Sequence, residues 1–306
     1  MTYVLFADTR LGLARDALAG LSVGDALGER FVGPGSTPAD LAAGRLPPSP
    51  WHWTDDTEMA CSVVSELAAL GEIDRDRLAR AFADRHQPHR GYGTGASTLL
   101  RLIRAGTPWP VAAASAFDGQ GSCGNGAAMR VGPLGAYFAD STARAAAQAR
   151  ASAEVTHAHP EGIAGAQAVA VAAALAARAR LTDDRPAPDR LLAAVAAALD
   201  PGTDVHHGVR RAAALLGRPV ADAADALGNG SRAVAQDTVP FTLWVAATHL
   251  ADYPAAVRAC VAAGGDVDTT AAVAGSVVAA HTGVGTPGGV PSAWLASREP
   301  LPDWVS

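Results

Sequence analysis

Runs of alanine are the feature of this sequence that most constrains its fold. Alanine is the commonest residue, and it occurs in uninterrupted triplets at 145–147, 172–174 and 196–198. Alanine has the highest helix propensity and loses no side-chain entropy on folding. Aromatic residues, which favour strands, make up only 5% of the chain. The sequence therefore predicts an all-α protein, and its 306 residues are enough to bury a sizeable core.

Apolar periodicity and Gly/Pro-rich breaks divide the chain into predicted helices and loops. The predicted helices cover 11–27, 57–70, 74–86, 96–105, 127–138, 141–154, 160–180, 189–199, 205–216, 231–250, 254–263 and 267–282. The segments 33–50, 87–95 and 118–126 are predicted loops, and the Pro- and Gly-rich tail 284–306 is expected to wrap the surface. Because no linker and no fixed-period repeat appears, we expect residues 1–306 to form a single domain.

The charge pattern argues against a nucleic-acid polymer as partner. The net charge is −6, every basic residue is Arg, and these residues are scattered rather than clustered into a basic patch. We find no apolar run of about 20 residues and no signal peptide in Met1–Arg10, so we expect no membrane partner. Three cysteines, Cys61, Cys123 and Cys260, form no disulfide framework, which fits a reducing cytoplasm. We also expect the chain to be a monomer.

The segment Trp53–Thr57 ends a Pro-rich loop and begins a predicted helix. It contains two adjacent carboxylates, Asp55 and Asp56, between two hydroxyls, Thr54 and Thr57. Hard oxygen ligands of this kind suit Mg²⁺ or Mn²⁺ rather than Zn²⁺. The alternative is a helix N-cap, because Thr and Asp are common at helix starts.

A second acidic segment, Gly264–Thr270, begins the apolar helix predicted at 267–282. Asp266 and Asp268 bracket one apolar residue there, and Thr269 follows. A capped helix is again the simple alternative. However, the helix is apolar nearly all round and so predicted to be central, and buried charges need partners. A metal ion is such a partner.

Two glycine-containing motifs complete the set of candidates. In 121–130, the small residues Ser122, Cys123, Gly124, Asn125 and Gly126 precede a helix and expose backbone N–H groups that can bind phosphate. A plain turn is the alternative. In 20–28, glycines at helical spacing favour close helix packing, and Asp25 on that face is either a neighbour of a ligand or a hydrogen-bonded core residue.

The histidine pairs do not predict a zinc site. His157 and His159 have i, i+2 spacing, which is poorly placed on a helix, and no further ligand follows at zinc spacing. His206 and His207 are expected to form a surface pair.

Four motifs in this order make the chain resemble the ADP-ribosylglycohydrolase family. They extend from residue 20 to residue 282 and are Gly24-Asp25-Ala26-Leu27-Gly28, Thr54-Asp55-Asp56-Thr57, Gly124-Asn125-Gly126 with Met129-Arg130, and Gly265-Asp266-Val267-Asp268-Thr269. Each motif alone is weak, but the joint match is highly specific. The resemblance implies a compact, orthogonal all-α bundle with a binuclear Mg²⁺ centre, in which Mn²⁺ is an alternative.

By this resemblance, six residues hold the two metal ions and the 121–126 loop binds the diphosphate and neighbouring ribose of ADP-ribose. The implied metal ligands are Thr54, Asp55, Asp56, Asp266, Asp268 and Thr269. His157 falls where the family often has a ligand-contacting histidine. The implied reaction is hydrolysis of the bond between ADP-ribose and an attached group, with Asp55 or, preferably, Asp56 as general base.

Two departures from the family pattern matter. Many relatives carry a Glu four residues after the Gly that matches Gly28, where this chain has Val32, and we hypothesise that Glu29 takes over its role. Some relatives have an aromatic residue at Cys123. Three alternatives stay open: binding of ADP-ribose or a related nucleotide without turnover, hydrolysis of a small molecule such as an O-acyl-ADP-ribose, and a purely structural role.

Overall fold

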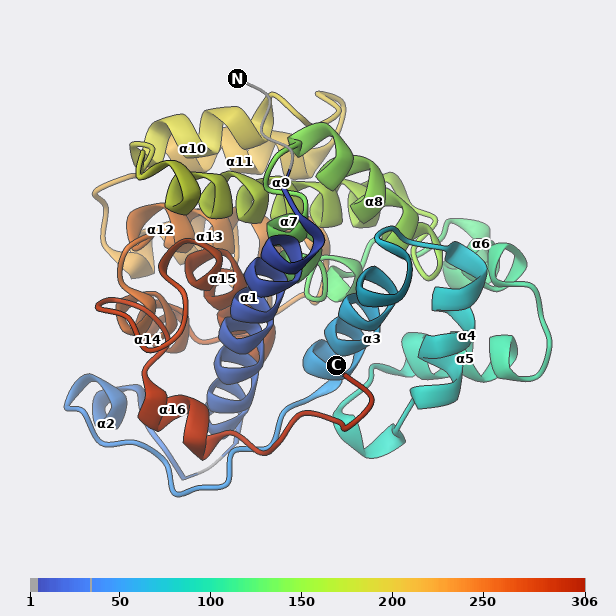
Figure 1. Ribbon diagram of the computed structural model, residues 1–306, viewed down its shortest axis with the longest axis horizontal. Coiled ribbons are helices and arrows are strands. Elements are labelled where there is room, and N and C mark those ends of the chain that lie inside the picture. Colours follow the sequence, from blue (N-terminus) through green and yellow to red (C-terminus); the bar gives the residue numbers. More distant parts are fainter. Residues whose placement is uncertain (1–4, 34, 306) are drawn as a thin grey trace.

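The computed structural model describes residues 5–33 and 35–305, and in this part of the chain it contains sixteen α-helices (Figure 1). Residues 1–4 lie outside the described residues, and they belong to the segment in which no signal peptide was expected. Residue 34, in the predicted 33–50 loop, also lies outside them. Within the described residues, extended backbone pairs only at isolated bridges. The prediction of an all-α protein is confirmed.

Most predicted helices form close to their predicted ranges. They are α1 Ala7–Gly28, α3 Asp55–Leu70, α4 Arg75–Arg85, α5 Thr94–Arg104, α8 Thr142–Glu154, α9 Pro160–Thr182, α10 Pro188–Ala196, α11 Asp204–Ala214, α13 Ala235–Thr248, α14 Tyr253–Ala263 and α15 Val267–Thr282. The helix predicted at 127–138 is shorter, α7 Gly132–Tyr137, and is preceded by a 3₁₀ turn, η3, at Asn125–Ala127.

Four short helices were not predicted: α2 Pro38–Ala42, α6 Trp109–Gly119, α12 Val220–Leu227 and α16 Ser292–Ser297. Each lies in or beside a Pro- or Gly-rich stretch that reads as a loop. The predicted 33–50 loop contains α2, which a capping box stabilises: the Thr37 side chain accepts from the Asp40 N–H, and Asp40 accepts from the Thr37 N–H. This cap stabilises a helix of five residues, which is too short to show an apolar period.

Helices α1 and α15 pack along each other through glycines at helical spacing. A Cβ atom at Gly20 would lie 2.2 Å from Ala279 Cβ, and one at Gly24 would lie 2.3 Å from the Ala271 carbonyl oxygen. At Gly28 the nearest atoms would be 2.7 Å away, in Val267 and Asp268. The predicted close packing is confirmed, and it brings the C-terminal end of α1 against the start of α15. Helix α15 is buried along nearly its whole length, as predicted.

Helix α9 is an apolar run where none was expected. By length and composition it could cross a membrane, with a mean hydropathy of 1.4 in its best 18-residue window. However, 83% of that window is buried inside the protein against other helices. Its alanines and valines form the core beside α7, α8 and α15.

The C-terminal tail does more than wrap the surface. It contains α16, in which Trp294 is buried against Trp51 with ring centroids 6.4 Å apart. The Trp51 N–H donates to the Ser297 carbonyl at 2.7 Å, and the Glu299 N–H donates to the Trp51 carbonyl at 2.9 Å. The tail thereby holds the loop that leads into α3, and it ends near that helix (Figure 1).

Candidate functional site

Asp25 of α1 holds the first acidic segment in place through hydrogen bonds. Its carboxylate is fully buried and accepts hydrogen bonds from the N–H and hydroxyl groups of both Thr54 and Thr57, the shortest at 2.5 Å from Thr57 Oγ1. Asp25 is thus a hydrogen-bonded core residue, one of the two readings that its sequence position allowed. Burial raises its pKa to about 6 in spite of these bonds.

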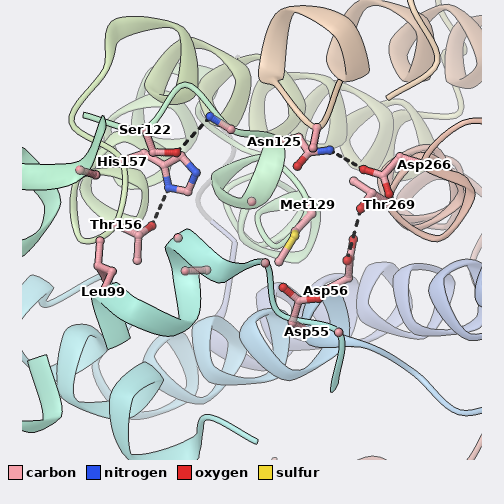
Figure 2. A pocket seen from close by; sticks show the side chains of 18 of the residues that line it. Asp55, Asp56, Leu99, Ser122, Asn125, Met129, Thr156, His157, Asp266 and Thr269 are labelled. Atoms are coloured by element: carbon pink, nitrogen blue, oxygen red, sulfur yellow. Dashed lines mark hydrogen bonds between the residues drawn. The ribbon is translucent and has the colours of Figure 1, made fainter. Parts of the chain in front are cut away.

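The two acidic segments contact each other through Asp56 and Thr269, which are 213 positions apart in the sequence. Thr269 Oγ1 donates to Asp56 Oδ2 at 3.4 Å, so the start of α15 contacts the start of α3 (Figure 2). The capping alternative holds only for Thr54, whose side chain accepts from the Asp56 N–H. Asp266 occupies the N-cap position of α15 but makes no capping hydrogen bond. Its carboxylate instead accepts a hydrogen bond from the Asn125 side chain at 2.7 Å.

Four carboxylates face one end of a cavity of about 330 Å³, those of Asp55, Asp56, Asp266 and Asp268. Burial first, and then the charge of Asp25, raise the pKa of Asp55 to about 8. Burial and like charges also raise the pKa of Asp56 and of Asp268 well above the usual range. Such a cluster is unfavourable at neutral pH without protons or a cation to offset the repulsion.

The donor set at this end of the cavity fits a hard divalent cation. Asp56 Oδ1 is buried and has no hydrogen-bond partner among the described residues. The neighbouring groups are carboxylates and hydroxyls, which Mg²⁺ and Mn²⁺ prefer. No three His, Cys, Asp or Glu side chains between residues 5 and 305, residue 34 aside, already converge on one point as a finished metal shell would. The fit therefore rests on chemistry and on the unpartnered oxygen.

The Gly-rich loop 121–126 also lines the cavity, through Ser122, Gly124, Asn125 and Gly126 (Figure 2). Two of its expected phosphate donors already have partners. The Gly124 N–H donates to Ser122 Oγ at 3.1 Å, and the Asn125 N–H donates to the Ala233 carbonyl at 3.2 Å. The Asn125 side chain donates to Thr238 and to Asp266. A ligand would thus meet fewer free donors here than the sequence suggests.

Three of the proposed site residues, Thr54, Cys123 and Glu29, do not line this cavity. Cys123 is partly exposed, and its carbonyl accepts from the Ala235 N–H. Thr54 lines a neighbouring cavity of about 550 Å³ together with Glu29.

Glu29 was expected to lie in a loop, and this expectation is wrong. It begins the 3₁₀ turn η1 Glu29–Phe31, which continues directly from α1. Its side chain lines the neighbouring cavity rather than the one with the four carboxylates. Burial first, and then the charge of Asp266, raise its pKa, so the two acidic groups still influence each other. Val32, at the position where relatives carry Glu, is exposed.

The histidine predictions have mixed outcomes. His157 lines the main cavity, whereas the His159 side chain caps α9 by accepting from the Glu161 N–H. Burial and then the Arg130 charge lower the pKa of His157 to about 3. The prediction of a surface pair at 206–207 is wrong for His206, which is buried, and right for His207.

Several cavity residues were not singled out from the sequence. They are mainly small or apolar residues, Gly91, Gly93, Gly95, Ala96, Leu99, Ala116, Phe117 and Ala233. The Gly-rich loop 87–95 carried a signal for the first three, because loops of this composition often shape sites. Phe117 adopts φ +52° and is 64% exposed at the cavity, in a segment whose helix was not predicted.

Comparisons with known proteins find relatives of this chain. A family model described as ADP-ribosylglycohydrolase matches residues 7–305. The ADP-ribosylhydrolase ARH3 of Danio rerio is 33% identical over 136 residues, which cover 40% of this chain and 37% of that protein. The Homo sapiens ADP-ribosylhydrolase ARH3 is 39% identical over 84 residues, 26% of this chain and 23% of that protein. The chain thus aligns with well under half the length of these curated relatives.

A solved structure extends the likeness over nearly the whole fold. The chain matches one titled "ADP-ribosylglycohydrolase-related protein complex" with a TM-score of 0.64 and 26% identity, covering 95% of this chain and 94% of the other. The predicted fold type is therefore confirmed.

Proposed function

The chain belongs to the ADP-ribosylglycohydrolase family, and from that premise we propose that it is a metal-dependent hydrolase. Its substrate would be ADP-ribose linked through a glycosidic bond to another group, whether a protein side chain, a nucleobase or a small molecule. The relatives named ADP-ribosylhydrolase support this reaction class, although they align with this chain over less than half their length.

One observation carries the proposal: a single cavity is lined both by the four carboxylates and by the Gly-rich loop with His157. Its volume of about 330 Å³ lies in the range of small-molecule sites. Asp55, Asp56, Asp266 and Asp268 line one part of it, and His157 with the Gly-rich loop lines another. A cavity of this kind suits a ligand whose sugar reaches the carboxylates while its phosphates reach the loop.

The proposed metal site consists of Thr54, Asp55, Asp56, Asp266, Asp268 and Thr269, and Mg²⁺ is the proposed ion, with Mn²⁺ as the alternative. Bound metal would orient ribose hydroxyls and lower the pKa of water near the anomeric carbon. Asp55 and Asp56 are the proposed general bases. Asp55 is the more exposed of the two to the cavity, whereas Asp56 is only 1% exposed, which favours Asp55 as acceptor of the proton from water.

Binding of ADP-ribose without turnover is the second candidate function. The observation that favours it is Val32, because a valine can neither ligate a cation nor accept a proton where many relatives have Glu. The retained carboxylates favour turnover, and they also make a purely structural role the weakest alternative.

A release assay on a panel of substrates tests the proposal. The panel contains peptides ADP-ribosylated on Arg or on Ser, and O-acetyl-ADP-ribose, each with Mg²⁺ and with Mn²⁺, while calorimetry measures ADP-ribose binding in parallel. We expect metal-dependent release of ADP-ribose from at least one substrate. Binding of ADP-ribose without release from any of them would support the second candidate, and absence of both would overturn the proposed function.

A further inference from the structure

A chain of three buried side chains leads from the core to the cavity. Arg130 Nη2 donates to Thr156 Oγ1 at 3.0 Å. Thr156 Oγ1 in turn lies 2.7 Å from His157 Nδ1, as Figure 2 shows. Arg130 is fully buried, and Thr156 and His157 are each 7% exposed. Solvent therefore has little access to these side chains, and hydrogen bonds and charges within the protein determine which of their atoms carry protons.

The hydrogen-bond pattern assigns the protons. An arginine has only donors, so Thr156 Oγ1 must accept from Arg130. The Thr156 hydroxyl proton then has one protein acceptor among the described residues, His157 Nδ1. If Nδ1 carried the proton instead, the hydroxyl proton would be left without a protein partner, and a buried donor of that kind costs about 1–3 kcal/mol.

The charge of Arg130 favours the same assignment. Its guanidinium packs over the Phe82 ring at 4.5 Å and also donates to the Ser152 carbonyl at 2.6 Å, so it is fixed on the Nδ1 side of the histidine. A positive charge there favours a lone pair on Nδ1 over an N–H group. It also opposes a second proton on the ring, in line with the lowered pKa of His157.

The opposite edge of the imidazole faces the cavity beside two glycines. A Cβ atom at Gly124 would lie 3.4 Å from His157 Nε2, and one at Gly126 would lie 3.4 Å from Cε1. Because neither residue has a Cβ, this edge of the ring is open toward a ligand. His157 lines the cavity and has no hydrogen-bond partner at Nε2 among the described residues.

We infer that Arg130 and Thr156 are positioning residues that lock His157 as a neutral, Nε2-protonated imidazole, and that its Nε2–H donates a hydrogen bond to an oxygen of the bound ADP-ribosyl group. The ligand part of this inference rests on the proposed function; the tautomer part does not. His157 is then a fixed donor for a phosphate or ribose oxygen and takes no part in proton transfer.

The tautomer is measured on the ligand-free protein by long-range ¹H–¹⁵N NMR of the imidazoles, with His157→Gln to assign the His157 signals. We expect a protonated Nε2 and an unprotonated Nδ1 in the wild type. Thr156→Val, which removes the hydroxyl but keeps the shape, should disturb this pattern, and Thr156→Ser should restore it. A wild-type His157 protonated at Nδ1 would overturn the inference whatever the protein hydrolyses.

Calorimetric titration with ADP-ribose measures the consequence for binding. Thr156→Val should raise the Kd roughly three- to tenfold, which is the effect of one misplaced hydrogen bond. The Kd of Thr156→Ser should stay within about twofold of the wild-type value. Thr242→Val is the matched control: it removes an equally buried hydroxyl, which bonds within α13 outside the cavity lining. It should leave the Kd unchanged.

Three outcomes distinguish this inference from the proposed function. Equal weakening by Thr156→Val and Thr242→Val would show a general loss of stability and overturn the positioning role. An unchanged Kd in Thr156→Val would do the same. A wild type that binds no ADP-ribose would overturn the proposed function together with the ligand part, whereas the NMR result would still decide the tautomer.

Discussion

The side-chain amide of Asn125 donates a hydrogen bond to Asp266, with Nδ2 2.7 Å from Oδ2 across 141 residues of sequence. The same nitrogen lies 3.0 Å from Thr238 Oγ1, so two hydrogen bonds hold the amide; Figure 2 shows the one to Asp266. The Gly-rich loop and the second acidic segment are thereby connected directly. Any ligand that moves the loop also moves a proposed metal ligand.

Asn125→Ala should therefore weaken metal binding as well as ligand binding. Partners of metal ligands commonly contribute 10–100-fold to metal affinity, so we expect the Kd for Mg²⁺ to rise at least about tenfold. Isothermal titration with Mg²⁺ measures the change. Gln167→Ala is the control, because that amide donates to the Ala146 carbonyl away from the cavity. A Mg²⁺ affinity equal to that of the control would mean that the Asn125 contact does not support a metal site.

Asp56→Asn should have opposite effects on stability and on turnover. Burial and the charges of Asp25 and Asp268 raise the pKa of Asp56, so its ionised form destabilises the metal-free fold at neutral pH. The metal-free variant should melt above the metal-free wild type, yet it should lose stabilisation by Mg²⁺ and at least about 100-fold in kcat. Asp222→Asn, at an exposed Arg pair, controls for loss of any carboxylate. A variant that Mg²⁺ still stabilises fully would argue against Asp56 as a ligand.

Glu29→Gln tests whether Glu29 replaces the Glu that is absent at Val32. Because the Glu29 side chain lines the neighbouring cavity, we expect kcat to fall less than about threefold, a small effect compared with the 10²-fold or larger loss of an acid–base group. Steady-state kinetics on the substrate identified by the panel provide the measurement. A fall of about 100-fold with unchanged thermal stability would instead place Glu29 in the catalytic apparatus.

The stability contribution of His157 should depend on pH. Its pKa in the folded protein is about 3, against 6.5 for an ordinary histidine, so the unfolded chain binds the extra proton and folding loses stability as pH falls below about 6.5. Between pH 8 and pH 5 this linkage amounts to about 2 kcal/mol. In urea unfolding, the free energy of unfolding of the wild type should exceed that of His157→Gln by a margin that shrinks by this amount from pH 8 to pH 5. A difference that stays constant with pH would show that folding leaves the pKa of His157 unchanged.

Local physical chemistry made the helices and the acidic segments predictable. Alanine propensity and apolar period decide α9 and α15, and side-chain capping marks the start of α3. The glycines at 20, 24 and 28 predicted a close helix contact without identifying the partner. Short helices such as α2 and α12 escaped prediction because their stability comes from a capping box in α2 and from contacts with α13 and α14 in α12.

The sequence by itself determined the fold class and the residue types at the candidate site, because both depend on local propensity and on ligand chemistry. Only the tertiary structure decided which groups meet. The contact of α1 with α3 places Asp25 against Thr54, and the contact of α1 with α15 places Asp268 beside Gly28. It is also the fold that turns the Asn125 amide toward Asp266 and the Glu29 side chain toward another cavity. These outcomes depend on packing between segments far apart in the chain, which no local pattern encodes.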